Sequence, residues 1–180
     1  MTLTFTVPGP PQGKARPRFT RYDKYGCRAA LNVYTPENTR EYEQKVKNAF
    51  NEKRMELRSA RFMSEPGSGA TPLKALESRL ISELKHPLFK ENTPITAVII
   101  GYFPIPKTAK KAVRELMFAG AVLHTKKIDC DNLAKVILDA LNGAAYKDDA
   151  QVARLIVKKI YAENPRVTVT LTDSVKEEPL

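Results

Sequence analysis

The stretch I-T-A-V-I-I-G-Y-F, Ile95 to Phe103, decides the fold expected for this chain. It is apolar at nearly every position, whereas a strand with one face in water alternates apolar and polar residues. The stretch therefore predicts a central strand that is buried on both faces. Pro104 and Pro106 follow it and end the strand, because proline has no backbone N–H to donate to a neighbouring strand.

Weaker strand patterns lie toward both ends of the chain. Residues 1–11, M-T-L-T-F-T-V-P-G-P-P, alternate apolar and polar side chains and lack the charged start and long apolar run of a signal peptide. They predict a first strand. Leu155 to Ala162 and Arg166 to Leu171 flank the turn E-N-P, and this spacing predicts a hairpin.

Two amphipathic helices are expected between these strands. The first has Thr35 as N-cap and Pro36 at its first helical position, and apolar residues recur along it at helical spacing: Tyr42, Val46, Ala49 or Phe50, and Leu57. The second spans Asp131 to Leu141, with Asp131 as N-cap. Together the elements predict an α/β (α+β) fold in which helices flank a mixed sheet, as a single domain over 1–180.

The composition favours a polyanionic partner. Thirty Lys and Arg against twenty Asp and Glu give a formal charge of +10 and a pI near 9.6. The longest apolar run is far shorter than the roughly 20 residues of a membrane helix, so no membrane partner is expected. Two cysteines, Cys27 and Cys130, cannot form a disulfide framework, and this favours a reduced, cytoplasmic setting.

Two segments carry the whole net charge. Pro8 to Arg28 and Lys107 to Lys127 each hold six basic residues against one acidic residue, a net +5 apiece. The first segment is too rich in Pro and Gly for regular structure. It interleaves aromatic residues with its cations, the mixture expected where a protein binds nucleic acid. The candidate DNA-binding residues are Lys14, Arg16, Arg18, Arg21, Lys107, Lys110, Lys111, Lys126 and Lys127. The alternative is that both segments are ordinary solvated surface.

The densest chemical pattern is I-D-C-D-N-L-A-K, Ile128 to Lys135, followed by K-D-D at 147–149. If Ile128 to Cys130 ends a strand, Asp129 and Asp131 point to one side, because strand side chains alternate. Carboxylates crowded into a basic protein repel one another unless a cation lies between them. A hard divalent ion, Mg²⁺, takes oxygen ligands, so Asp129, Asp131, Asp148 and Asp149 are candidate metal ligands.

Structural roles for the same residues stay open. The D-x-D pair can be a helix cap plus a surface charge, the D-D pair an ordinary turn, and Lys135 a partner of Asp131 or Asp139, each four residues away. Cys130 is expected to pack in the core, and His124 is a candidate phosphate contact. No zinc spacing, Walker loop, G-x-S-x-G or G-x-G-x-x-G is present in the sequence, so no nucleotide cofactor is expected.

The run H-T-K-K-I-D-C-D-N-L-A-K-V-I-L-D-A-L-N-G-A-A-Y-K-D-D-A-Q-V, His124 to Val152, resembles the RusA-type Holliday junction resolvases of bacteria and their prophages. The resemblance extends to P-I-P-K before it, to N-P-R-V-T-V-T-L after it and to F-T-V-P-G-P-P-Q-G-K-A-R-P-R near the start. It covers roughly Leu3 to Phe50 and Ile95 to Leu171.

The resemblance implies a homodimeric endonuclease that depends on Mg²⁺, with Mn²⁺ as the alternative ion, and that nicks four-way DNA junctions symmetrically during recombination and repair. By motif position it implies three catalytic aspartates and a catalytic lysine: Asp129, Asp131, Asp149 and Lys135. The chain departs from the family at Cys130, where a larger aliphatic residue is expected, and at Ile128, where proline is frequent. A segment over about 51–92, with a flexible linker at 64–72 and a short leucine helix, is longer than the family's usual connection.

The sequence thus predicts a structure-selective DNA endonuclease. Two alternatives accompany it: a metal-dependent nuclease acting on flaps or other branched DNA, and a non-catalytic DNA-binding protein whose aspartates cap a helix and form a turn.

Overall fold

The computed structural model describes residues 1–22, 28–63, 84 and 86–173, and only the backbone of 20–22, 28–32 and 61–63. Its centre is a four-stranded mixed sheet in the order β1-β6-β4-β5. The strands are β1 (Thr2–Pro8), β4 (Ile95–Pro104), β5 (Val152–Ala162) and β6 (Arg166–Thr172). β4 is an interior strand, antiparallel to β6 and parallel to β5. The predicted central strand and mixed sheet are confirmed. The predicted burial on both faces is wrong, because buried residues of β4 alternate with half-buried ones and only one face is fully covered.

The hairpin predicted at the C-terminal end is wrong. β5 and β6 do not pair with each other, because β4 lies between them. Strands two apart in a sheet are about 10 Å from each other, and the connection of residues 163–165 is long enough to cross that gap. Both β5 and β6 pair with the apolar β4 and not with each other, so closeness in sequence does not decide which strands pair.

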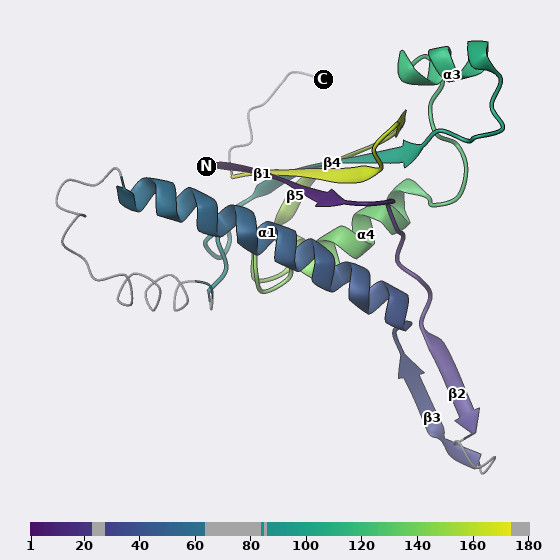
Figure 1. The fold of residues 1–180 in the computed structure, drawn as a ribbon. Helices are drawn as coiled ribbons and strands as arrows, with labels where there is room; N and C mark the ends of the chain where they lie inside the picture. The colour runs from purple at the N-terminus through teal and green to yellow at the C-terminus, as the bar shows by residue number, and fades with distance from the viewer. Residues whose placement is uncertain (23–27, 64–83, 85, 174–180) are drawn as a thin grey trace.

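Helices α1 (Glu37–Met63) and α4 (Cys130–Leu141) cover one face of the sheet (Figure 1). Alternate residues of β1 and β4 face them, and the helices contribute residues such as Val46, Phe50 and Ile137 to the same buried cluster. Helix α1 begins one residue later than predicted, after Pro36, whose carbonyl accepts a hydrogen bond from the N–H of Arg40 at 3.2 Å.

The apolar face of α1 differs from the prediction at one position. Leu57 is 40% exposed, whereas Arg54 is fully buried. The guanidinium of Arg54 donates to the carbonyls of His86 at 2.8 Å and Ala144 at 3.4 Å. Helical spacing gives the side of the helix on which a side chain lies, but not which other segments pack there. The pattern therefore could not predict that Arg54 is buried and Leu57 exposed.

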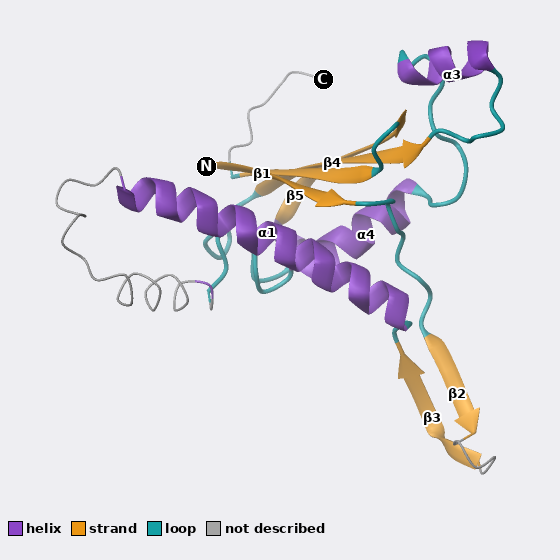
Figure 2. Ribbon diagram, viewed as in Figure 1, coloured by secondary structure: helices purple, strands orange, loops and turns teal. Residues whose placement is uncertain are grey.

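Two arms project from the sheet (Figure 2). β2 (Arg18–Tyr22) and β3 (Arg28–Tyr34) form an antiparallel ribbon where an irregular loop was expected. The β-branched and aromatic residues of these strands account for it, since they favour extended pairing despite the prolines before them. The second arm carries α3 (Lys111–Phe118).

Several predicted features lie outside the described residues. These are the linker at 64–72, the helix residues Leu73, Leu76 and Leu80, Cys27, and the side chain of Arg21. Within the described ranges, no helix combines the length and the apolar character needed to cross a membrane.

Candidate functional site

Asp129 and Asp131 lie at the start of α4. The helix begins at Cys130, and Asp129 is its N-cap, with φ −75° and ψ 158°. This corrects the expected strand over Ile128 to Cys130 and the expected N-cap at Asp131. The carbonyl of Asp129 accepts a hydrogen bond from the N–H of Leu133 at 3.0 Å. The helix therefore includes Cys130, one residue before the predicted start. Both carboxylates are exposed, and both lie near the positive end of the helix dipole.

The residues around this turn are held from two sides. The ammonium of Lys159, on β5, donates to the carbonyl of Ile128 at 2.7 Å and to that of Lys126 at 3.2 Å. From the other side, the N–H of Lys14 donates to the carbonyl of Asn132 at 3.0 Å. The first turn of α4 is therefore fastened both to the sheet and to the segment that leads into β2.

The second acidic pair lies on a short turn after α4. The carboxylate of Asp148 accepts from the N–H of Ala150 at 2.9 Å and caps η2 (Asp149–Gln151). The side-chain amide of Gln151 donates to the carbonyl of Lys90 at 2.9 Å, which fastens this turn to the segment before β4. η2 and α4 are in contact.

A buried tyrosine links the two acidic segments. The hydroxyl of Tyr146 donates to the carbonyl of Leu138 on α4 at 3.0 Å. Burial raises the pKa of Tyr146 far above its ordinary value, and the negative charges of Asp149, Asp139 and Asp148 raise it further. The hydrogen bond of Tyr146 and the contact between η2 and α4 hold the turn with Asp148 and Asp149 beside the helix.

The four candidate metal ligands lie as two pairs on two separate turns. Asp129 and Asp131 share one helical turn, and Asp148 and Asp149 share another. Among the described residues, no group of three or more His, Cys, Asp or Glu side chains is close enough to hold a metal ion. The donors are all carboxylate oxygens, the type that Mg²⁺ prefers, and Mg²⁺ is commonly held by one or two carboxylates together with water and substrate phosphate.

Lys135 follows Asp131 by one helical turn and is exposed. Within the described part of the chain it forms no ion pair, whereas Asp139, one of its expected partners, pairs with Lys14 at 2.8 Å. The ammonium of Lys135 is therefore available on the side of α4 that carries Asp131.

The candidate DNA-binding residues fall into two groups. Most are exposed on the two arms and their roots: Arg16, Arg18, Lys107, Lys110, Lys111, Lys126 and Lys127. Lys14 differs, because its ammonium contacts the carboxylates of both Glu43 and Asp139. Figure 1 shows the two arms projecting from the same end of the sheet, with α4 beginning between them.

Two residues beside the aspartates differ from expectation. Cys130 is exposed, because it is the first residue of a helix and not part of a strand that faces the core. His124 is buried and stacks on Phe103 with ring centroids 3.8 Å apart. Burial lowers the pKa of His124, as do the charges of Lys159 and Lys126. A neutral, buried imidazole is unsuited to hold a phosphate.

Sequence reasoning missed several residues that support the site. Gln151 belongs to the quoted run D-D-A-Q-V, so its amide had a local signal. Lys159 and Glu43 had none, because each lies on an element whose partner is distant in sequence.

A known family and a curated relative are similar to this chain. The family described as Endodeoxyribonuclease RusA matches residues 8–66 and 73–172. A protein of Bacillus subtilis (strain 168), "Uncharacterized protein YqaN", is 40% identical over 82 residues. That match covers 44% of this chain and 58% of the relative's own length. The family match spans most of the chain, including both acidic pairs and both arms, and the chain therefore belongs to the RusA endodeoxyribonuclease family.

Proposed function

We propose that this protein is a Mg²⁺-dependent, structure-selective DNA endonuclease that resolves four-way junctions by paired symmetric nicks in recombination and repair. The observation that carries the proposal is the position of Asp129 and Asp131, at the start of α4 and between the roots of two basic arms. Cations on the arms would bind the DNA backbone, and the carboxylates between them would act on a phosphodiester.

The four acidic residues are given different roles toward the metal ion. Asp129 and Asp131 would hold Mg²⁺, or Mn²⁺ in its place. Asp149 as third ligand, with Asp148 beside it, would have to move closer to them when metal and DNA bind, because no three carboxylates of the described residues are close enough to share an ion. The bound ion would activate water and stabilise the negative charge of the transition state. The exposure of Asp129 and Asp131 supports this role, because water and a substrate phosphate have access to both.

Lys135 would act on the phosphate itself. Its exposed ammonium lies one turn along α4 from Asp131, and within the described residues no carboxylate pairs with it. In the cutting step the water oxygen bonds to phosphorus, one bridging P–O bond breaks, and the leaving oxygen takes up a proton. A cation at this position favours the added negative charge on the phosphoryl oxygens.

The proposal includes a homodimer. Resolution of a four-way junction needs two matched cuts, and a two-fold symmetric dimer holds two identical sites in fixed relation. We expect analytical ultracentrifugation to give twice the mass of one chain.

The central experiment compares three DNA substrates of matched sequence: a synthetic four-way junction, a flap and a linear duplex. Each is incubated with the protein in Mg²⁺ or in EDTA, and cuts are mapped on every strand. Paired symmetric nicks on the junction alone, and only in Mg²⁺, are expected. Equal cutting of flaps would favour the broader branched-DNA nuclease, and cutting in EDTA would contradict the metal mechanism.

Substitutions separate chemistry from binding. Asp129→Asn, Asp131→Asn and Asp149→Asn should each abolish cutting while junction binding in a native gel persists. Glu56→Gln is the matched control, since it removes one carboxylate charge from an exposed ion pair with Lys53 on α1. If the wild-type chain binds junctions and never nicks them, the aspartates are only the cap of α4 and the turn before β5.

A further inference from the structure

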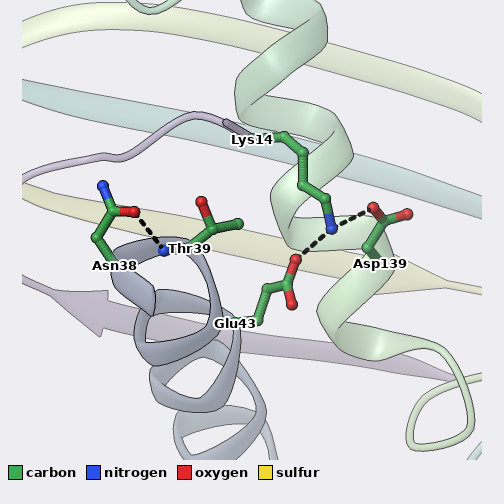
Figure 3. A network of polar contacts seen from close by, with 5 residues as sticks. All are labelled: Lys14, Asn38, Thr39, Glu43 and Asp139. Carbon is green, nitrogen blue, oxygen red and sulfur yellow. Dashed lines mark hydrogen bonds and ion pairs between the residues drawn. The ribbon is translucent and has the colours of Figure 1, made fainter. Parts of the chain in front are cut away.

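Lys14 joins three parts of the molecule through one ammonium group (Figure 3). It lies in the segment between β1 and β2. Its Nζ contacts the Asp139 carboxylate on α4 at 2.8 Å and the Glu43 carboxylate on α1. Its side chain is only 21% exposed, so the contact is largely shielded from solvent.

The backbone of the same segment packs against the acidic turn of α4. The N–H of Lys14 bonds to Asn132, which follows Asp131. A Cβ on Gly13 would lie 2.8 Å from Cγ2 of Ile128, closer than packed atoms come, and 3.3 Å from Cβ of Asn132, a tight contact. Residues 13–14 therefore touch α4 at its first turn through the backbone and again at Asp139, about 10 Å further along the helix, through the ammonium.

The charge of Lys14 is already neutralised within the protein. Burial lowers its pKa, but the hydrogen bonds and charges of Asp139 and Glu43 outweigh burial, so the pKa lies above its ordinary value and the ammonium persists at neutral pH. Arg16 and Arg18, a few residues along the same segment, are exposed by contrast. Lys14 belongs to the same basic run as these arginines without sharing their access to DNA.

We propose that Lys14 is a positioning residue that holds the root of the β2–β3 ribbon and α1 against α4, so that the DNA-binding arm and the acidic turn keep a fixed relation. The inference rests on the proposed nuclease function. Its consequence is that the cutting rate, and not the affinity for DNA, depends on Lys14.

The test compares Lys14→Met with Arg16→Met. For each variant we would measure the junction Kd over a range of salt concentrations and the cutting rate in a single turnover. Lys14→Met should slow cutting about tenfold, as loss of a supporting residue typically does, with Kd and its salt dependence unchanged. Arg16→Met should raise Kd and lower the slope of log K against log salt by about 0.9, because one fewer counterion is released.

Two further comparisons address a purely structural effect. Lys14→Arg should restore most of the rate, because a guanidinium can bind both carboxylates. Lys53→Met is the matched control, since it also removes an ammonium from an ion pair on α1 and should leave the rate unchanged. Hydrogen exchange gives a readout without catalysis, and the amides of 129–133 should exchange faster in Lys14→Met than in Lys53→Met.

The partners of Lys14 keep the inference testable if Lys14→Met fails to fold. Asp139→Asn and Glu43→Gln weaken the contact while keeping the ammonium, and each should slow cutting without tightening the junction complex. If either tightens binding, or if Lys14→Met behaves like Arg16→Met, Lys14 is a phosphate contact and the inference is wrong. Failure of the wild-type chain to cut any junction in Mg²⁺ contradicts the proposed function instead, and the exchange rates still decide the role of Lys14.

Discussion

Gly101 leaves the space that lets α4 approach the sheet. It lies on the face of β4 that packs against α4, where a Cβ would be 2.9 Å from Cδ2 of Leu133 and 3.0 Å from Cε2 of Phe103. Leu133 is fully buried and follows Asp131 by two residues. A methyl group added by Gly101→Ala must therefore displace a packed side chain close to the acidic turn.

The size of the effect follows from two opposing contributions. Overpacking a core costs about 1–3 kcal/mol, and replacing glycine by alanine returns about 0.4–1 kcal/mol by restricting the unfolded chain. The two contributions leave a net loss between about 0 and 2.6 kcal/mol in the free energy of unfolding, and we expect about 1–2 kcal/mol, the middle of that range. For a chain of this length 1 kcal/mol corresponds to about 2–4 °C, so the Tm should fall by about 2–8 °C.

A double-mutant cycle with Leu133→Ala tests the cause. Leu133→Ala alone should cost about 2–5 kcal/mol, and the space it vacates accepts the new methyl group. The combined variant should therefore be at least about 0.5 kcal/mol more stable than the sum of the two single effects. Thermal unfolding followed by circular dichroism gives all four values.

Gly120→Ala is the matched control. Gly120 has φ +74° with open space around its Cβ position, so alanine there is strained by its backbone and not by crowding. Its cost should add to that of Leu133→Ala without coupling. Strict additivity for Gly101→Ala as well would refute the packing argument.

Two other predictions concern Tyr42 and Cys130. Burial raises the pKa of Tyr42 to about 12, so the folded chain keeps a proton that the unfolded chain loses above pH 10. The titration of Tyr42 should therefore lower the free energy of unfolding by up to about 1.4 kcal/mol per pH unit between pH 10 and 12. Urea titrations over this range should show a smaller decrease for Tyr42→Phe than for the unchanged chain. An equal fall in both chains would disprove it. Cys130 is exposed, so in a Cys27→Ser chain a maleimide should label it without unfolding, and bound junction DNA should slow the labelling. Labelling that requires denaturant would contradict this.

Local patterns predicted the elements that are decided by their own residues. The apolar run at Ile95 to Phe103 identified the central strand, and the pattern from Asp131 to Leu141 identified α4. The first residue of α4 lies one position earlier than predicted and its N-cap two positions earlier, because either Asp129 or Asp131 can cap a helix and sequence does not say which carbonyl accepts the first bond.

Features that depend on contacts between residues far apart in the sequence could not be predicted from local patterns. The pairing of β5 and β6 with β4 depends on a competition among strands that sequence proximity does not resolve. Lys14 looked like a DNA contact because the carboxylates that bind it lie 29 and 125 positions away, on α1 and α4. The D-x-D and D-D pairs were readable as candidate ligands, but the sequence does not say how close they lie, and among the described residues no three of these carboxylates are close enough to share an ion.

The sheet order also constrains when this protein can fold during its synthesis. β6 lies between β1 and β4, and Thr2 of β1 pairs with Thr172, 170 positions later. β1 leaves the ribosome first but has no partner strand until β6 is complete. The buried faces of β1 and α1 therefore stay without their full covering through most of translation, a period in which such surfaces are prone to aggregate or to bind chaperones.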